Sequence, residues 1–214
     1  MCIRDRSRLA AYDIASEALS EQWAPQASEG VKGLIVDPDK IWVSGDFFRM
    51  NGQRARGLTT VDPDNGALLP IDSPDVWVID IAAQGNRIFV AGGGPGGVAM
   101  AFDRTTGDML WETDSNGNFQ AVDVYGDYVY FGGHHTKIFP ISRDDRSVQI
   151  PVGQVSRHDI ATGVVDESWL PFVNGLRGVN AVDASADGIF IGGDFTFVAR
   201  MAQEGFAGFT FGVN

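Results

Sequence analysis

Four short β-type segments of this chain each run into glycine, and their recurrence constrains the fold more than any other feature. The segments are IWVSGDF, IFVAGGG, VYFGGHH and IFIGGDF, and their equivalent glycines are Gly45, Gly92, Gly133 and Gly193. These glycines are separated by 47, 41 and 60 residues. Similarity at such a period is typical of repeat proteins, in which each unit covers its apolar face with the next unit.

Each unit carries further strand and turn signals. An alternating apolar segment precedes each glycine-ended strand, at 31–36, 78–82, 121–125 and 179–184, and a turn of Asp, Asn, Gly or Pro joins the two. A third segment contains an aligned aspartate, and a fourth contains a tryptophan in most units. These positions are Asp13, Asp62, Asp103 and Asp159, and Trp23, Trp111 and Trp169. The pattern predicts an all-β fold, a β-propeller of four-stranded antiparallel blades with about four repeats.

The repeat pattern also predicts the domain organisation. Residues 1–7 lie outside the pattern, and the predicted propeller domain covers 8–214, with blade units at approximately 8–30, 31–77, 78–118, 119–178 and 179–214. The first unit contains only third and fourth strands, and the last contains only the first three. These partial units permit a small ring closed within the chain or an arc of a larger ring. We expect the arc, a fragment of a longer protein, because both ends supply a third strand.

Composition excludes several classes of function. The net charge of −12 argues against nucleic-acid binding, which depends on clusters of Lys and Arg. No stretch approaches the roughly 18 apolar residues of a membrane-spanning helix, so we expect no membrane insertion. The single cysteine, Cys2, permits no internal disulfide and no multi-cysteine metal site.

Two resemblances follow from these motifs. Segments 45–68 and 192–198 resemble the GGDFT-type propeller repeats of large secreted or surface-attached bacterial proteins, which implies an extracellular or cell-surface location. Segment 99–113, AMAFDRTTGDMLWET, is similar to the repeat of quinoprotein propellers. This second resemblance implies that Trp111 docks against a neighbouring blade. Some quinoproteins are dehydrogenases that use pyrroloquinoline quinone with calcium, and others are assembly scaffolds.

The histidines are the first candidate ligands. His134 and His135 are adjacent, so an extended strand directs them to opposite faces and they cannot both bind one metal. We interpret them as a polar strand end that meets solvent, with a ligand role as the less favoured alternative. His158 aligns with apolar and aromatic residues in other units, which predicts a semi-buried packing residue. DPDNG (62–66) lacks the spacing of a calcium loop, and no helix follows GGGPGG (92–97) to bind phosphate.

The third unit contains an insertion between His134 and Gly153. Its alternating apolar segments predict a small extra hairpin on the rim around the channel mouth, with Arg143, Asp144, Asp145 and Arg146 at its tip. Loops on a rigid scaffold often carry binding residues. We therefore take this tip as a candidate site for a protein or glycan partner; the alternative is a tolerated insertion without a partner.

The sequence predicts no catalytic residues, no metal site and no cofactor. The function we expect is that of a non-catalytic module, a rigid binding or scaffolding surface within a larger secreted or surface protein. The alternative is a propeller enzyme with its site at the channel mouth. Such an enzyme would be carbohydrate-active, or a quinoprotein-like dehydrogenase that uses pyrroloquinoline quinone with calcium.

Overall fold

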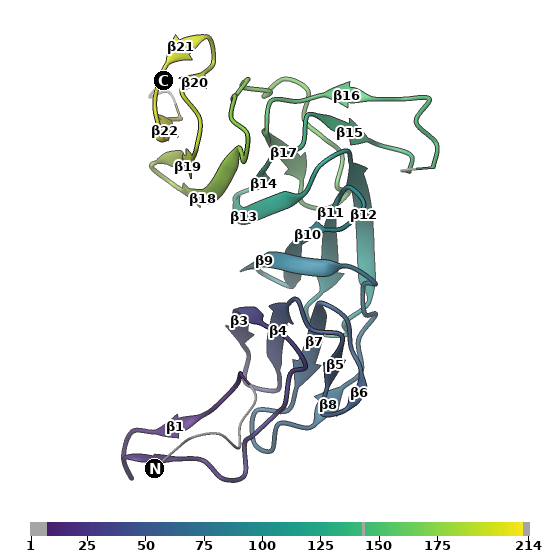
Figure 1. Cartoon of the computed structure of the whole chain (residues 1–214), viewed down its shortest axis with the longest axis vertical. Coiled ribbons are helices and arrows are strands. Elements are labelled where there is room, and N and C mark those ends of the chain that lie inside the picture. Colours follow the sequence, from purple (N-terminus) through teal and green to yellow (C-terminus); the bar gives the residue numbers. More distant parts are fainter. Residues whose placement is uncertain (1–7, 143, 212–214) are drawn as a thin grey trace. The chain divides into compact units, whose positions relative to one another are not determined.

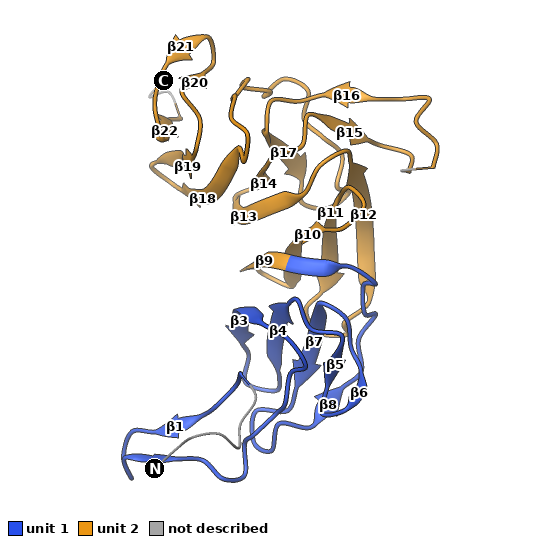
Figure 2. Cartoon of the chain, viewed as in Figure 1, with its two compact units in different colours: residues 1–78 blue, residues 79–214 orange. Residues whose placement is uncertain are grey.

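The computed structural model describes residues 8–142 and 144–211, and all its regular elements are β-strands (Figure 1). The predicted all-β fold is confirmed. The chain forms two compact units, unit 1 (Met1–Val78) and unit 2 (Ile79–Asn214), shown in Figure 2. Strand β9 (Trp77–Gln84) crosses the boundary between them. The divisions between individual repeats remain predictions.

Unit 1 is built on one antiparallel sheet in the order β3-β4-β7-β8. Its strands are Val31–Val36, Ile41–Gly45, Leu58–Val61 and Leu68–Leu69. Two hairpins accompany it: β1 (Tyr12–Asp13) with β2 (Ala18–Leu19), and β5 (Arg49–Met50) with β6 (Gln53–Arg54). The core of this unit joins side chains of the sheet to the segment that precedes it: Leu9, Trp23, Ala27, Val43, Phe47, Met50, Ala55 and Val61.

The described residues of unit 2 form three sheets of three or more strands and one two-stranded hairpin. The first has the order β16-β15-β12-β11-β10-β9, with β10 (Arg87–Gly93), β11 (Gly97–Asp103), β12 (Met109–Ser115), β15 (Lys137–Phe139) and β16 (Ile150–Pro151). The second consists of β13 (Phe119–Tyr125), β14 (Tyr128–Gly133) and β17 (Val155–Asp159). The third consists of β18 (Val179–Ser185), β19 (Gly188–Gly193) and β22 (Phe206–Phe209), with a hairpin of β20 (Phe197–Val198) and β21 (Met201–Ala202).

The second sheet of unit 2 has three strands, whereas the sequence predicts four for this repeat; the third sheet has three, the number expected for the last unit. In the second sheet the fourth strand is reduced to an isolated bridge between His158 and Val165. The Asp166 carboxylate accepts hydrogen bonds from the Ser168 amide and hydroxyl at 2.8 and 2.6 Å, which turns the chain where that strand would continue. Trp111 lies on the predicted fourth strand β12, but Trp23 and Trp169 lie outside strands.

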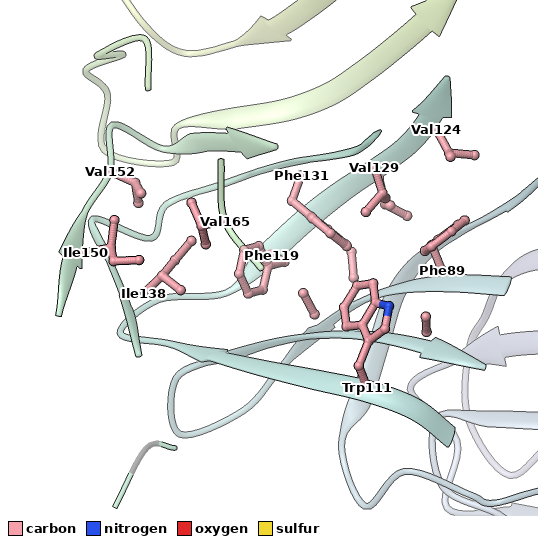
Figure 3. Packing of buried hydrophobic residues seen from close by; sticks show 14 residues of the cluster. Phe89, Trp111, Phe119, Val124, Val129, Phe131, Ile138, Ile150, Val152 and Val165 are labelled. Carbon is pink, nitrogen blue, oxygen red and sulfur yellow. The ribbon is translucent and has the colours of Figure 1, made fainter. Parts of the chain in front are cut away.

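Neighbouring sheets of unit 2 bury their apolar faces against each other. Figure 3 shows the larger cluster, in which Phe119 and Phe131 lie 5.2 Å apart and Phe89 lies 6.2 Å from Trp111. The Trp111 indole donates a hydrogen bond to the Ile160 carbonyl at 3.1 Å. Gly163, with φ of +72°, lies under the indole ring, where an added Cβ would come within 2.6 Å of it. These contacts join β12 to the turn after β17.

Close backbone approach explains three of the four equivalent glycines. A Cβ on Gly45, Gly133 or Gly193 would clash with the carbonyl oxygen of Gly30, Asn118 or Gly178, respectively. Gly92 is not explained in this way; it lies near the turn of the β10–β11 hairpin, where it pairs with Val98. The repeated glycine therefore allows the entry to the first strand to pass directly over the end of the second strand.

The aligned aspartates make one recurrent turn. Each carboxylate accepts a hydrogen bond from the amide three residues later, at 2.6 to 3.0 Å. The pairs are Asp13 with Ser16, Asp62 with Asn65, Asp103 with Thr106 and Asp159 with Thr162. The next residue has a left-handed backbone, with φ of +71°, +82° and +72° at Gly66, Gly107 and Gly163 and of +54° at Glu17. The four aspartates therefore stabilise the backbone conformation of this turn.

Candidate functional site

The insertion of the third repeat forms the extra hairpin predicted from its alternating pattern. Strands β15 and β16 pair through Lys137 with Pro151 and Ile138 with Ile150. The hairpin does not stand alone, because Phe139 and Ile138 of β15 pair with Asp114 and Ser115 of β12. It therefore extends the preceding sheet beyond its last strand (Figure 1). The position of this hairpin relative to a channel mouth remains a prediction.

The tip of this hairpin is exposed at Asp144, Asp145 and Arg146, and Arg143 lies outside the described residues. The Asp145 carboxylate accepts a hydrogen bond from the Ser147 amide at 3.0 Å, and bonds from Ser147 lower the pKa of this carboxyl group. The Arg146 guanidinium lies 5.1 Å from the centre of the Phe139 ring. These contacts stabilise the conformation of the loop itself, and a binding role for the tip remains a prediction.

The adjacent histidines lie just after the end of β14, and their side chains have different surroundings. His134 is half-buried, and its Nε2 accepts a hydrogen bond from the Asn118 amide at 3.3 Å. His135 is completely buried, with its ring 4.3 Å from that of Phe119. The expectation that His135 meets solvent is therefore wrong. The chain turns into the insertion after β14 and carries this side chain into the core.

His135 and His158 form a buried polar chain through Ser156. The Ser156 hydroxyl lies 3.3 Å from His135 Nε2 and 3.0 Å from His158 Nε2. His158 Nδ1 lies 3.0 Å from the Gly163 carbonyl, an acceptor, so this nitrogen carries the proton and Nε2 is an acceptor. Ser156 must then donate to His158 and accept from His135 Nε2. His135 Nδ1 is left as a buried acceptor that has no hydrogen-bond partner among the described residues.

This network is suited to structure and not to catalysis. His135, Ser156 and His158 are all fully buried, so no substrate reaches the hydroxyl. Burial lowers the pKa of His135 to about 3 and that of His158 to about 4, which keeps both rings neutral near pH 7. His158 is thus more buried than the semi-buried packing residue expected, because its ring nitrogens are satisfied within the core.

A different surface emerges from the two GDF segments, which fold alike. After β4 and after β19, a buried phenylalanine, Phe47 or Phe195, is followed by a two-residue hairpin turn. Equivalent amides make equivalent bonds: Gly57 donates to Phe47 at 3.0 Å, and Gly205 donates to Phe195 at 2.9 Å. Both hairpins also bridge the preceding segment, through Ala27 with Met50 and through Val173 with Val198.

The side chains on these equivalent backbones differ in charge. The first hairpin places Arg49, Arg54 and Arg56 where the second has Phe197, Ala202 and Glu204. Because the backbone is the same, the arginines are not needed to form the hairpin. They are candidate binding residues, which the repeat pattern alone does not single out. Comparison of the two aligned segments could have revealed them.

We call the residues Phe48, Arg49, Arg54, Arg56 and Asp75 the arginine surface; they line a depression of about 260 Å³ in unit 1. One oxygen of Asp75 accepts from Arg54 at 3.1 Å and from Arg56 at 3.2 Å. The Arg56 guanidinium also lies 5.4 Å from the centre of the Phe48 ring. The Arg54 side chain is 80% exposed and the Asp75 side chain is 64% exposed, so both are accessible to a ligand.

The arginine surface is positive within an acidic chain. Its three arginines and one aspartate leave an excess of positive charge, whereas the whole chain carries −12. Hydrogen bonding to Arg56 is the main cause that lowers the pKa of Asp75, and Arg54 adds to the effect against the opposing influence of desolvation. Asp75 is therefore ionised at neutral pH and shows that these guanidinium groups can accommodate a carboxylate.

A second depression adjoins the arginine surface at Phe48. It is about 400 Å³ and is lined by Glu29, Gly30, Asp46, Phe48 and Trp77. The aromatic residues are accessible, with Phe48 47% and Trp77 42% exposed. Asp46 is paired with Lys32 at 2.8 Å. Unit 1 thus presents cationic and aromatic side chains next to each other.

The described residues contain neither a cluster of metal-binding side chains nor a membrane-spanning helix. Within 8–142 and 144–211, no three or more His, Cys, Asp or Glu side chains gather into a group that could hold a metal ion. The same residues contain no helix that is long and apolar enough to cross a membrane.

Comparison with solved structures shows the propeller fold. A computationally designed protein, Ika4, is similar over 86% of this chain and 93% of its own, with 15% identity and a TM-score of 0.56. The WD40 repeats of RRP9 give 12% identity and a TM-score of 0.54, and the match covers 87% of this chain and 54% of that chain. The quinohemoprotein alcohol dehydrogenase of Comamonas testosteroni gives 14% identity and 0.55, over 91% of this chain and 40% of the dehydrogenase.

These identities establish the fold alone, and this chain spans about half or less of the two natural proteins. A comparison with curated proteins found no match. A family model described as outer membrane protein assembly factor BamB matches residues 54–169. This result supports the quinoprotein-like repeat predicted from segment 99–113, whereas the GGDFT-type resemblance remains a prediction. Because the matched region is more than half of the chain, the protein belongs to this family of PQQ-like propeller repeats, described as outer membrane protein assembly factor BamB.

Proposed function

We propose that this protein is a non-catalytic propeller module that binds a macromolecular partner through the surface of the β5–β6 hairpin. The observation that carries the proposal is the difference between two hairpins with the same backbone. One presents Arg49, Arg54 and Arg56, and the equivalent positions of the other present Phe197, Ala202 and Glu204. Side chains that the fold does not require are available for recognition.

Rigidity supports this role. The hairpin is fixed at its base by the buried Phe47 and by the pairing of Met50 with Ala27. Its turn residues, Asn51 and Gly52, have φ of +51° and +76°, which suits the tight turn of a two-residue hairpin. The arginines are therefore presented on an ordered support, which limits the conformational entropy lost when a partner binds.

The location belongs to the same proposal. The matching family is described by an outer-membrane assembly factor, and the GGDFT-type repeats that the chain resembles occur in secreted or surface-attached proteins. We place the module outside the cytoplasm as part of a larger protein. The predicted binding role of the insertion tip at 143–146 would provide a second contact surface.

The test is site-specific photo-crosslinking in the organism that encodes the chain. A photoreactive residue replaces Gln53, which is exposed on β6, and in a matched control it replaces Met201 at the equivalent position of β21. We expect one discrete, saturable cross-linked partner at Gln53. Failure to obtain a partner at Gln53, with the chain folded and located outside the cytoplasm, would contradict the proposal.

A second measurement addresses the enzyme alternative. Pyrroloquinoline quinone is titrated into the chain with calcium, and its absorbance spectrum and the heat of binding are recorded. We expect neither a shifted spectrum nor saturable heat. Saturable binding of the quinone would favour a quinoprotein-like dehydrogenase over a binding module.

A further inference from the structure

The arginine surface and the neighbouring aromatic depression define the chemistry of a ligand. We infer that they bind an acidic peptide segment in which aspartate or glutamate lies next to an aromatic or aliphatic residue. This inference rests on the proposed function and assigns a partner class to the same surface. Its three guanidinium groups supply planar donors that match carboxylates, and they lie beside two exposed aromatic rings.

Asp75 shows how a carboxylate of a ligand could bind to the arginine surface. Its carboxylate lies between Arg54 and Arg56 at 3.1 and 3.2 Å, within hydrogen-bonding distance of both guanidinium groups. The pair with Arg54 is highly exposed, and such pairs contribute little to stability. A carboxylate of a partner can therefore share or replace this contact at small cost. It can also reach Arg49, whose contact is with the backbone carbonyl of Gly52 at 3.0 Å.

The aromatic side chains favour a peptide over a simple anion. Phe48 borders both depressions, and Trp77 lies in the second. Their exposed rings gain from contact with an apolar side chain, whereas a free phosphate or carboxylate ion would leave them in water. The Arg56 guanidinium packs over one face of the Phe48 ring, so this ring lies next to the positive charges of the arginine surface.

The surrounding charge disfavours a polyanion such as nucleic acid. Glu29 and Asp46 line the second depression, directly beyond Phe48, and the chain as a whole carries −12. Each of these carboxylates is paired with a cation, Glu29 with Arg8 at 3.4 Å and Asp46 with Lys32 at 2.8 Å. A phosphate backbone that continued past the arginine surface would therefore gain little from these balanced ion pairs. A short acidic segment followed by an apolar residue avoids them, because its charge ends where the aromatic contact begins.

The inference is tested with the full chain and two fluorescein-labelled peptides by fluorescence anisotropy. One peptide contains Asp-Asp-Phe and the other contains Asn-Asn-Phe in the same context. We expect the acidic peptide to bind, its affinity to fall as salt rises, and the amide peptide to bind at least about tenfold more weakly. Equal binding of the two peptides, or preferential binding of a labelled oligonucleotide, would overturn the inference.

Variants locate the site and give effects of opposite sign. Arg54→Glu should weaken binding of the acidic peptide by at least about tenfold. The control Arg200→Glu, in the turn of the equivalent hairpin, should leave the affinity unchanged. Asp75→Asn removes the competing carboxylate and should tighten binding by about two- to fivefold. Phe48→Ala should weaken the binding of both peptides. Unchanged thermal unfolding of each variant excludes loss of the fold as the cause.

The outcomes separate this inference from the function on which it rests. A partner that cross-links at Gln53 but is unaffected by Arg54→Glu would overturn the acidic-peptide inference and leave the binding module intact. Weaker peptide binding by Asp75→Asn would also count against the carboxylate model. Peptide binding that follows the predicted order of variants would support both.

Discussion

At the scale of single residues, burial sets the protonation state of two histidines in the core. His135 and His158 are joined through the Ser156 hydroxyl, and both rings are fully buried. A charged imidazolium in that position would lose its hydration without gaining an anionic partner. The chain therefore folds most stably when both rings are neutral.

This coupling predicts a pH-dependent stability. The unfolded histidines titrate near pH 6.5, whereas the folded pKa values are about 3 for His135 and about 4 for His158. Below pH 6.5 the unfolded chain binds more protons, so the free energy of unfolding should fall as pH decreases from about 6.5 to about 4. The slope is at most about 1.4 kcal/mol per pH unit for each histidine. Urea unfolding at a series of pH values measures it.

The histidine variants test the assignment. His158→Gln should reduce the slope of the unfolding free energy between about pH 6.5 and pH 4 to about half, because His135 still contributes, even if the change lowers stability overall. The wild-type chain, measured over the same pH range, is the control. A wild-type slope in His158→Gln would show that other groups titrate in this range.

Trp111 is the residue at which truncation should be most costly. Its indole packs on Gly163, contacts Phe89 and donates to the Ile160 carbonyl. Trp111→Ala should lower the free energy of unfolding by about 3–5 kcal/mol, because it leaves a cavity and removes a hydrogen bond. Leu110→Ala, on the same strand but 44% exposed, should cost less than about 1 kcal/mol. Chemical denaturation measures both values. Equal losses of unfolding free energy in the two variants would contradict the buried packing of Trp111.

At the scale of secondary-structure elements, the glycine at the end of the second strand controls how the first strand enters the sheet. Gly45 and Gly30 face each other, but only one of them lacks space for a side chain. A Cβ at Gly45 would clash with the Gly30 carbonyl oxygen, whereas a Cβ at Gly30 would have no contact closer than 3.9 Å. The same substitution at the two positions should therefore have different effects.

Gly45→Ala should lower the free energy of unfolding by about 1–3 kcal/mol, because the backbone of the entering strand must shift. Gly30→Ala should change it by less than about 1 kcal/mol. The difference between the two midpoints in urea is the quantity to measure. Equal and small effects would mean that the strand entry adapts to a Cβ, and that the recurrent glycine has another cause.

Adjacent first strands in unit 2 are joined by aspartates. The Asp80 carboxylate accepts from the Val122 amide at 2.9 Å, and the Asp123 carboxylate accepts from the Ala184 amide at 2.7 Å. Each also accepts from the amide of the next residue, Ile81 or Val124. Desolvation raises the pKa of Asp80, which shows that it is held away from water. These bonds link β9 to β13 and β13 to β18.

Asp123→Ala should therefore lower stability by about 1–3 kcal/mol, since it leaves backbone amides without their acceptor. Asp183→Ala, a change at an exposed position of β18, should alter stability by less than about 0.5 kcal/mol. Hydrogen exchange gives a local readout, because the Ala184 amide should exchange faster in Asp123→Ala. Unchanged protection at Ala184 would show that this bond does not form in solution.

At the scale of the whole molecule, apolar burial is distributed among separate clusters. Unit 1 has a core around Val43, Phe47 and Trp23, whereas unit 2 has one cluster around Phe119 and another around Tyr130. In repeat proteins, stability is approximately the sum of the units and of the interfaces between neighbours. A destabilising substitution in one cluster should therefore lower the stability mainly of the strands that form that cluster and of the adjacent sheets.

Hydrogen exchange of Trp111→Ala tests this distribution. We expect protection to fall in β10–β14 and to remain near the wild-type level in β4 and β7, which belong to the core of unit 1. The wild-type chain, measured under the same conditions, is the control. A uniform loss of protection in all strands would show that the chain unfolds as one cooperative body.

Much of the fold could be predicted because its determinants are local in sequence. Glycine-ended strands, Asp-containing turns and alternating apolar residues act over a few residues, and they recur in the same order in successive units. The additional hairpin of the insertion was predicted for the same reason. The missing fourth strand was not, because it depends on the turn made by Asp166 with Ser168 and on what covers the sheet edge.

The sites were less predictable because they depend on contacts between distant segments. His135 could not be assigned to the core from its neighbours, since its burial depends on Ser156 and Phe119. The arginine surface likewise depends on Asp75, which lies 19 residues beyond Arg56 and is brought to it by folding. The repeating local pattern thus established the class of fold, whereas burial, pairing and surface charge required the segments to be brought together in space.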